Sequence, residues 1–543
     1  SRAGADPDED LLSWIRKDGL AEIDEVVSDP TFTGSRLGQR LAEGGKLPML
    51  GFPTQSRQLF LDPPKEWPVR TIDRDAALAV STFSPGSDLV KDKGVFTSVG
   101  FAAYKPRGRQ VLPDESPLGE ELLVGSCTVC GGLWAAAPGQ SQCPNCTSAW
   151  DRDTELGYQE VEAIMPKGYR ATFRKPRDFE GRLEWSSNAG RARLATTPVG
   201  QVQSRQGLFW VAGNASTFQL NDHGGRLFSI APSMDRRRGW IDLECFDNTD
   251  LKLQTGQVPE SVDRDKKRDV ALISRKQTDV LALFREAGAL NLSLRADSPS
   301  RRGAWYSLAY LLRNAAARFL DVDPPEIDVG VAPRQTSDGD WVSSIFFSDY
   351  LENGAGYSTR LGDESVLPRF MEYARACETT SQIHPESTDP CDTACYRCLQ
   401  DYRNMAFHGI LDWRLACDLL DLLADGDVDV TKRWSALRER AVNAFADGFK
   451  HEFFADHQHG RPVLIGTDHD HAIVPVHPLE MPPDHLNEDL AEVVLDLEDD
   501  GFVVPDPYST GGSGQPKGQG RISFATDFDL VRRPGWVYGN LWH

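Results

Sequence analysis

The chain has 543 residues, of which 40% are hydrophobic and 26% charged, and its formal net charge is −22. This length predicts about three to four domains, and the acidic balance excludes a histone-like polybasic protein while leaving room for a local basic groove. No apolar run approaches the roughly 18 residues of a membrane span, and the acidic start, SRAGADPDED, lacks the pattern of a signal peptide. We expect a soluble, cytoplasmic protein with no membrane partner. It starts with Ser1 rather than Met, as in a trimmed or partial polypeptide.

The predicted elements divide the chain into four regions. Residues 1–120 form a helical and mixed segment, with helices in LLSWIRKDGLAEIDEVV, SRLGQRLAEGG and IDRDAALAVSTF and a strand near VFTSVGF. Residues 121–265 form a β-rich domain with separate strands in LFWVAGN, TFQLND, RLFSIAP and GWIDLECF. Residues 266–428 form an α/β domain, in which AWYSLAYLLRNAAARFL is a long amphipathic helix and SSIFFSD a buried strand. Residues 429–543 form a mixed α/β extension with a helix in WSALRERAVNAF, two or three strands and a flexible loop, STGGSGQPKGQG. The expected fold class is α+β and multi-domain.

Four cysteines form two Cys-x-x-Cys turns: Cys127, Cys130, Cys143 and Cys146. Each turn presents two thiolates from one tight bend, so the two turns can meet around one tetrahedral Zn²⁺. Four cysteines close the coordination sphere and leave no position for water, which predicts a structural site. A thioredoxin-type redox pair is the alternative, and two matched pairs argue against it.

A second quartet has a less regular spacing: Cys377, Cys391, Cys395 and Cys398. Short-spaced cysteines inside a large chain indicate a metal site rather than a disulfide framework. From spacing alone we expect zinc, and an iron–sulfur cluster, which takes the same four thiolates, is the alternative.

Other candidate sites are weaker. The sequence has no G-x-x-x-x-G-K-[ST], G-x-S-x-G or H-E-x-x-H pattern, so we expect no catalytic residues and no ATP hydrolysis by this chain alone. On a strand His469 and His471 would share one face as a candidate metal-ligand pair, and the alternative is a polar strand and loops. The turn Gly354-Ala355-Gly356-Tyr357 either offers backbone N–H groups to phosphate or is a plain turn.

A basic stretch points to nucleic acid. Residues 165–194 carry eight Lys or Arg against three acids, a local net charge of +5, with four interleaved aromatic side chains. Such a pattern is typical of stacking platforms in a basic groove, and the alternative is a solvated basic face above core aromatics. The DNA contacts predicted from this stretch and from the later Arg triplet are Lys167, Arg170, Arg174, Lys175, Arg177, Arg236, Arg237 and Arg238.

The segment SSIFFSDYLENGAGYSTRL and the string CYRCLQDYRN, Cys395–Asn404, resemble one known domain. It is the zinc-binding domain at the C-terminal end of a group of superfamily 2 DNA helicases, named for the bacterial repair helicase MrfA. In that family four cysteines bind zinc, which implies the same role for Cys377, Cys391, Cys395 and Cys398. Upstream, KLPMLGFPTQSRQLF and the CTVC and CPNC turns resemble the region after the helicase core in very large members, as in the Druantia and, more loosely, DISARM anti-phage systems.

The resemblance implies a function but also shows a departure. The ATP-binding helicase core that normally precedes this region is missing, so the chain is either the C-terminal part of a longer helicase or a subunit that works with a separate motor. We expect a two-zinc accessory region of an ATP-dependent DNA helicase in bacterial anti-phage defence, which guides or grips a single strand or fork. ATP would act only through a core outside this chain, and the partners would be DNA, the motor and other defence proteins. The alternative is an acidic, zinc-stabilised protein-interaction scaffold that does not bind DNA.

Overall fold

The computed structural model describes residues 17, 19–28, 37, 41, 56–114, 116–136, 139–152, 156–173, 175–181, 191–194, 198–223, 225–243, 261–376, 391–505 and 520–541. Within these ranges, no helix has both the length and the apolar character needed to cross a membrane. Of the two helices predicted before residue 50, the first overlaps α2 (Gly19–Ser28). The second falls almost wholly outside the described residues, as does most of the STGGSGQPKGQG loop.

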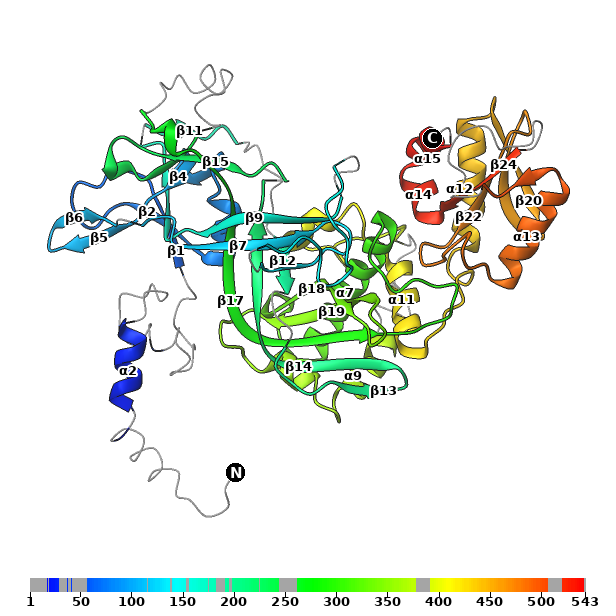
Figure 1. Ribbon diagram of the computed structural model, residues 1–543, viewed down its shortest axis with the longest axis horizontal. Coiled ribbons are helices and arrows are strands. Elements are labelled where there is room, and N and C mark those ends of the chain that lie inside the picture. Colours follow the sequence, from blue (N-terminus) through cyan, green and yellow to red (C-terminus); the bar gives the residue numbers. More distant parts are fainter. Residues whose placement is uncertain are drawn as a thin grey trace, which may run out of the picture.

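The first part of the molecule is a small mixed sheet around one apolar core (Figure 1). Its central strand, β4 (Gly94–Phe101), is the strand predicted near VFTSVGF, and it pairs antiparallel with four others. The predicted helix in IDRDAALAVSTF begins later than expected, because its first residues form an edge-paired strand and Asp75 then caps the helix by accepting from the Ala77 N–H. The elements here are β1 (Ser56–Phe60), β2 (Thr71–Asp75), α4 (Ala76–Thr82), β3 (Asp88–Lys91), β10 (Gly168–Ala171), β11 (Arg177–Asp178), β15 (Phe228–Pro232), η1 (Arg236–Arg238), β16 (Trp240–Asp242) and η2 (Arg264–Lys266).

A long strand joins this part to the next. β17 (Arg268–Arg285) pairs with β15 at its start, with β9 (Tyr158–Met165) just after, and with β14 (Leu208–Asn221) and β19 (Trp341–Asp349) further on (Figure 1). The two strands predicted in LFWVAGN and TFQLND are one continuous strand, β14, because every residue from Leu208 to Asn221 has a partner on β17. The other strands of this sheet are β7 (Glu120–Cys127), β8 (Leu133–Ala135), β12 (Arg191–Leu194), β13 (Gln203–Arg205) and β18 (Ile327–Gln335).

Helix α7 (Pro299–Leu320) lies at the centre of the largest apolar core. Ser298 caps it by accepting from the Arg301 N–H, and Pro299 occupies the first turn, where no N–H is needed. The prediction of an amphipathic helix is wrong here, because the face opposite the apolar stripe is buried as well. On that face Tyr306 packs on Phe407, with ring centroids 4.2 Å apart. The neighbouring helical elements are η3 (Pro324–Glu326), α8 (Tyr357–Leu361), α9 (Leu367–Ala376), η4 (Tyr402–Phe407) and α11 (Trp413–Asp425).

The C-terminal part is a three-layered α/β unit with helices on both faces of a five-stranded sheet (Figure 1). The strand order is β20-β21-β22-β24-β23; the first three strands are antiparallel, and β24 lies parallel to both β22 and β23. The helix predicted in WSALRERAVNAF is α12 (Ser435–Gly448), and the sheet has more strands than the two or three expected. The other elements are β20 (Phe453–Gln458), β21 (Arg461–Gly466), β22 (His471–Val476), α13 (Glu488–Asp499), β23 (Phe502–Val503), β24 (Gly520–Thr526), α14 (Asp527–Arg532) and α15 (Pro534–Asn540).

A buried polar cluster attaches this C-terminal unit to α11. Asp418, fully buried on α11, accepts hydrogen bonds from Arg433, from Trp434 Nε1 at 2.7 Å and from His477 Nε2 at 3.1 Å. The other ring nitrogen of His477 accepts from the Leu479 N–H at 3.1 Å, so Nε2 carries the proton that bonds Asp418. These bonds cross between the two parts of the chain and hold the segment after β22 against α11.

Candidate zinc centres and basic surfaces

The first cysteine quartet forms a compact cluster at the end of β7. The four sulfur atoms lie within 4.8 Å of one another, and the pairs Cys127–Cys146 and Cys130–Cys143 are both 3.6 Å apart. A tetrahedral Zn²⁺ with bonds of about 2.3 Å places its sulfur ligands about 3.8 Å apart. The cluster therefore has the size and donor set of a closed, structural zinc site.

The two turns of this cluster have the same backbone geometry. In the first, the Gly131 N–H donates to the Cys127 carbonyl at 2.9 Å, and in the second the Thr147 N–H donates to the Cys143 carbonyl at 2.9 Å. Gly131 and Thr147 both have positive φ, 74° and 59°, which lets each turn fold tightly enough to aim two thiols at one point. Ser148 Oγ lies 3.2 Å and 3.1 Å from the sulfurs of Cys127 and Cys146 and can donate to a thiolate.

Crowding makes these thiols ill-suited to ionise together. Hydrogen bonds from Cys130 and Cys143 lower the pKa of Cys127, whereas the hydrogen bond with Cys127 raises the pKa of Cys130. Four thiolates at this spacing repel one another unless a cation lies between them, and a bound metal deprotonates a thiol outright. The same residues also pack on the neighbouring sheet, because Cys127, Cys130 and Cys143 share an apolar cluster with Trp341 at the start of β19.

The second cluster contains three described cysteines. The sulfur of Cys398 lies 4.0 Å from that of Cys391 and 3.9 Å from that of Cys395, and the Cys395 N–H donates to the Cys398 sulfur at 3.1 Å. Burial raises the pKa of both Cys391 and Cys398. Three thiols fill three corners of a tetrahedron. Cys377, the predicted fourth ligand, lies outside the described residues.

Neighbouring elements hold this second cluster in place. Asn314 on α7 donates to the Cys398 carbonyl at 2.7 Å, and Trp413 Nε1 on α11 donates to the Cys391 carbonyl at 2.9 Å. Arg313, buried on α7, forms an ion pair with Asp401, the residue that caps η4. The loop is thus fixed from both long helices, and its outer side exposes Tyr396, Arg397, Tyr402 and Arg403.

The glycine-rich turn after β19 is a capped turn. Asp349, fully buried, accepts from the N–H groups of Ala355 at 2.7 Å, Tyr357 at 3.0 Å and Ser358 at 2.8 Å, and from the Ser358 hydroxyl at 2.7 Å. The carboxylate occupies the place that a phosphate would take. Of the two alternatives for this loop, the geometry therefore supports the plain turn.

The predicted DNA-contacting residues do not come together. Strand β11, which carries Arg177, pairs with Val95 on β4, whereas Trp240, which follows Arg236–Arg238, pairs with Phe101. These two positions are six residue steps apart along β4, or about 20 Å at 3.3 Å per residue. The basic residues thus form two groups, one at each end of the same strand.

The predicted DNA-contacting side chains differ in exposure and in whether an acidic side chain neutralises them. Lys175, Arg177, Arg236 and Arg237 are exposed, and Arg238 is half-exposed. Arg177 pairs with Asp88, and Lys167 Nζ lies 3.3 Å from the Asp114 carboxylate. Arg170 is fully buried, with its guanidinium over the Phe173 ring at 4.4 Å, so a bound strand has no access to it. The expectation for Arg170 is corrected on that ground, and Arg174 lies outside the described residues.

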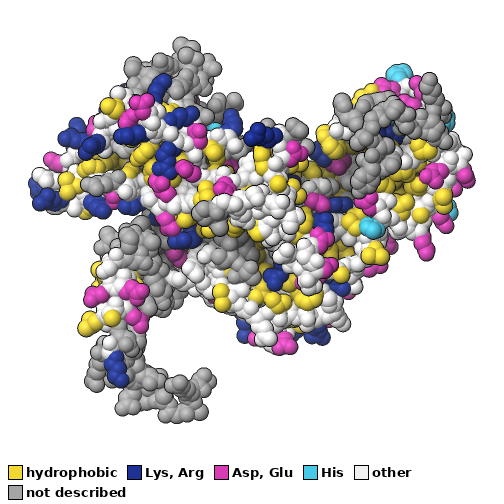
Figure 2. Space-filling model, viewed as in Figure 1, with side chains coloured by type: hydrophobic (Ala, Val, Ile, Leu, Met, Phe, Trp, Pro, Cys, Tyr) yellow, Lys and Arg dark blue, Asp and Glu magenta, His cyan; other side chains and the backbone are white. Residues whose placement is uncertain are grey.

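Further basic residues lie beside the Arg triplet and were missed in the sequence. The hairpin β5 (Tyr104–Arg107) and β6 (Gln110–Pro113) carries Lys105, Arg107 and Arg109, all exposed. Tyr104 Oη donates to the Arg237 carbonyl at 2.5 Å, which places the triplet at the base of the hairpin. Figure 2 shows dark-blue side chains at the end of the molecule where Figure 1 draws β5 and β6. The string KPRGRQ, three cations around a turn glycine, is the signal that could have found them.

The histidine pair does not form a metal site. His471 starts β22 but His469 precedes the strand in a turn with φ of 53°, so the two do not share a strand face. His471 is buried, with Nε2 3.2 Å from the Leu541 carbonyl oxygen. Among the described residues, the groups of three or more potential ligands are the two cysteine clusters alone.

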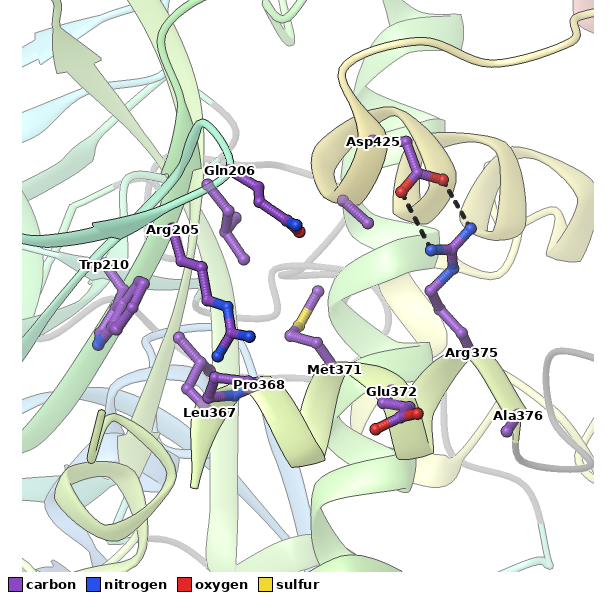
Figure 3. A pocket seen from close by; sticks show the side chains of 12 residues that line it. Arg205, Gln206, Trp210, Leu367, Pro368, Met371, Glu372, Arg375, Ala376 and Asp425 are labelled. Atoms are coloured by element: carbon purple, nitrogen blue, oxygen red, sulfur yellow. Dashed lines mark hydrogen bonds and ion pairs between the residues drawn. The ribbon is translucent and has the colours of Figure 1, made fainter. Parts of the chain in front are cut away.

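A groove of about 470 Å³ opens between the β13–β14 hairpin, α9 and the end of α11 (Figure 3). Its floor is apolar, with Leu208, Leu367 and Met371 among its lining residues. At its rim Arg375 is bound to Asp425 at 2.7 Å, and Arg205 and Glu372 add one charge of each sign. The charged side chains that line the groove therefore balance in number.

Comparison with known families identifies the class of domain. Residues 308–399 match the family model of the MrfA Zn-binding domain. The matched segment runs from the middle of α7 to the residue after Cys398, and so contains Cys391, Cys395 and Cys398. This part of the chain is similar to MrfA-type zinc-binding domains, which confirms the resemblance and favours zinc over an iron–sulfur cluster in the second site. The chain has two structural zinc sites.

Individual relatives extend the likeness beyond that domain. The Druantia protein DruE of Escherichia coli (strain UMEA 4076-1) is 23% identical over 435 residues, which cover 74% of this chain and 22% of DruE. The chain therefore spans about a fifth of the length of this curated relative. Among solved structures, the helicase MrfA bound to DNA is 11% identical with a TM-score of 0.34, covering 76% of this chain and 39% of MrfA. MrfA alone is 10% identical with a TM-score of 0.26, covering 70% and 41%.

Proposed function

We propose that this chain is the zinc-stabilised accessory region of a superfamily 2 DNA helicase that acts in bacterial anti-phage defence. The observation that carries the proposal is the match of residues 308–399 to the MrfA Zn-binding domain, over the segment where three thiols converge. The likeness to a Druantia protein supports the defence role. ATP hydrolysis would belong to a motor outside this sequence, joined to it or bound as a partner in the cytoplasm.

The proposed physical role is to grip a DNA strand. The second zinc loop exposes Tyr396 and Tyr402, each 67% accessible, next to Arg397 and Arg403. Exposed aromatic rings beside cations bind single strands by stacking on the bases and neutralising phosphates. We propose Cys377 as the fourth zinc ligand, because a closed tetrahedral site would hold this loop rigid.

The basic group at the β11 end of β4 would hold the same strand or the fork. We assign this role to Lys175 and Arg177, which are exposed, with Arg174 from the same basic string. Arg236, Arg237 and Arg238 form the second basic group, and Lys167 contributes less because Asp114 neutralises it. Other defence proteins would bind the acidic surface that a net charge of −22 implies.

Fluorescence anisotropy with a labelled single strand tests the grip, using the full chain over a range of salt concentrations. Replacing Arg174, Lys175 and Arg177 by Gln should weaken binding and flatten the salt slope by about 2, because each phosphate contact contributes about 0.7. Tyr396→Ala with Tyr402→Ala should weaken binding without changing that slope. The matched control, Arg440→Gln with Lys450→Gln, removes exposed charge from α12 and the loop after it.

Two results would contradict the proposal. Binding that is equal in all variants would remove these residues from the interface. A wild-type chain that binds no DNA at any salt concentration, yet binds a protein in a salt-insensitive manner, would establish the scaffold alternative.

A further inference from the structure

The hairpin β5–β6 is a two-faced ribbon. Its antiparallel register pairs Tyr104 with Pro113, Lys105 with Leu112, Pro106 with Val111 and Arg107 with Gln110. Because side chains alternate along a strand, Lys105, Arg107, Gln110 and Leu112 share one face. All four are exposed, whereas Tyr104 on the other face is buried. The ribbon therefore packs on the protein through Tyr104 and Val111 of one face, and turns its cationic face to solvent.

The apolar face anchors the ribbon. An isolated two-stranded hairpin is marginal in water, so its conformation depends on such contacts. Tyr104 packs edge-on against Phe60, with ring centroids 4.7 Å apart, and Val111 packs on the same small cluster. The Trp67 N–H donates to the Arg109 carbonyl at 3.1 Å, which ties down the turn. Gly108 at the tip has φ of 63°, and a Cβ there would meet no atom within 4 Å. The base of the hairpin is therefore held by the protein, whereas its tip at Gly108 has open space around it.

The outward face is positive in an acidic protein. Residues 104–113 contain three cations and no acid, while the whole chain carries −22. Lys105 pairs with Asp114 at 3.0 Å. Within the described part of the chain no ion pair joins Arg107 or Arg109 to a carboxylate, and the exposed Arg236 and Arg237 lie beside the base through the Tyr104–Arg237 bond. Both guanidinium groups are exposed and, among the described residues, have no acidic partner, so they are available to an anionic ligand.

We propose that this ribbon enters the major groove of double-stranded DNA. The inference rests on the proposed DNA-handling function and names the duplex as the substrate of this one element. The major groove is about 12 Å wide and admits a two-stranded β-ribbon. Arg side chains bond guanine edges, Gln bonds adenine, and an apolar side chain such as Leu112 contacts the thymine methyl. Arg236 and Arg237 would hold the phosphates flanking the groove. The major groove of an RNA duplex is too deep and narrow for side chains.

The test compares duplex and single-strand binding in the full chain. The variant is Arg107→Gln with Arg109→Gln, and the control is again Arg440→Gln with Lys450→Gln. We expect the ribbon variant to bind a 20-base-pair DNA duplex about 10-fold or more weakly, with its affinity for either single strand changed less than about twofold. The control should bind both as the wild type does. Methyl green, which binds the major groove, should displace the wild-type protein from the duplex. Netropsin, which binds the minor groove, should not.

Several outcomes would overturn the inference. They are an equal loss of single-strand and duplex binding, displacement by netropsin but not by methyl green, and tighter binding of an RNA duplex or of an acidic protein at the ribbon. A wild type that binds single strands but no duplex would refute the ribbon's role and leave the proposed function intact. A wild type that binds neither would refute both. Two zinc ions per chain in the ribbon variant would show that it is folded, so a loss of duplex binding would be attributable to the two Arg residues.

Discussion

Asp418 is the residue whose loss should most clearly weaken the contact between the C-terminal unit and α11. Its carboxylate is fully buried and accepts from Arg433, Trp434 Nε1 and His477 Nε2. Asp418→Ala leaves two neutral donors buried without a partner, at about 1–2 kcal/mol each. Arg433 keeps its 2.9 Å bond to Asp421, so its charge stays partly compensated. We expect a loss of about 3 kcal/mol in the stability of this contact, at the lower end of the range for breaking a buried pair.

Hydrogen exchange measured by mass spectrometry reports on this contact locally, which matters because a multi-domain chain does not unfold in one step. The amides of His477, Leu479 and Met481 are bonded to Glu480, to His477 and to Asn291. A loss of about 3 kcal/mol should speed their exchange by about 100-fold. Asp425→Ala on the same helix is the matched control, since Asp425 is 55% exposed and its pair with Arg375 contributes under about 1 kcal/mol. Equal exchange in the two variants would refute the proposed importance of the buried cluster.

Three further predictions concern the zinc sites, the capped turn and pH. Cys127→Ser should lower bound zinc from two ions per chain to one, measured by elemental analysis, and a chain that keeps two would refute the first site. Asp349→Ala should deprotect the amides of Ala355, Tyr357 and Ser358 in hydrogen exchange, because it removes their shared acceptor at a cost of about 3 kcal/mol; unchanged protection would contradict the capping role. Burial raises the pKa of Asp412 to about 6 from 3.8. The folded state then holds this proton more tightly than the unfolded state, so stability falls by about 3 kcal/mol as pH rises from about 4 to 6. Asp412→Asn should remove this fall in stability between about pH 4 and 6, measured by urea unfolding. An unchanged dependence of stability on pH would refute the raised pKa of Asp412.

Both zinc clusters lie where segments distant in sequence meet. The first packs on Trp341 of β19, and the second is bonded to Asn314 of α7 and Trp413 of α11. Metal binding energy in such sites is folding energy, because the ligands are not assembled in the unfolded chain. The zinc ions therefore stabilise the junctions between elements as well as their own loops, which suits a region that would bear load from a strand.

Predictions from the sequence were most accurate where the relevant physics is local. A Cys-x-x-Cys turn is set by the backbone of a few residues, so the spacing of Cys127, Cys130, Cys143 and Cys146 was enough to predict one metal cluster. Strand β19 and helix α12 followed from periodicity for the same reason. The predicted ends of strands and helices were less accurate. The split predicted within β14 was wrong because its residues pair with β17 along its whole length, a contact between segments about 60 residues apart.

The sequence by itself determined the cysteine cluster of the first site, the resemblance of Cys395–Asn404 and its surroundings to a known zinc-binding domain, and the overall acidic charge. Only the tertiary structure decided which charged side chains are exposed to a binding partner. Arg170 and Arg177 belong to one basic segment of the sequence. Arg170 is nevertheless buried, with its guanidinium against the Phe173 ring, whereas Arg177 is exposed. Tyr104 and Arg237 are 133 residues apart, yet their hydrogen bond brings two basic segments to one surface. The physical reason is that metal-binding turns are encoded by neighbours in the chain, whereas burial and surface charge depend on strand pairing between segments that only the folded chain brings together.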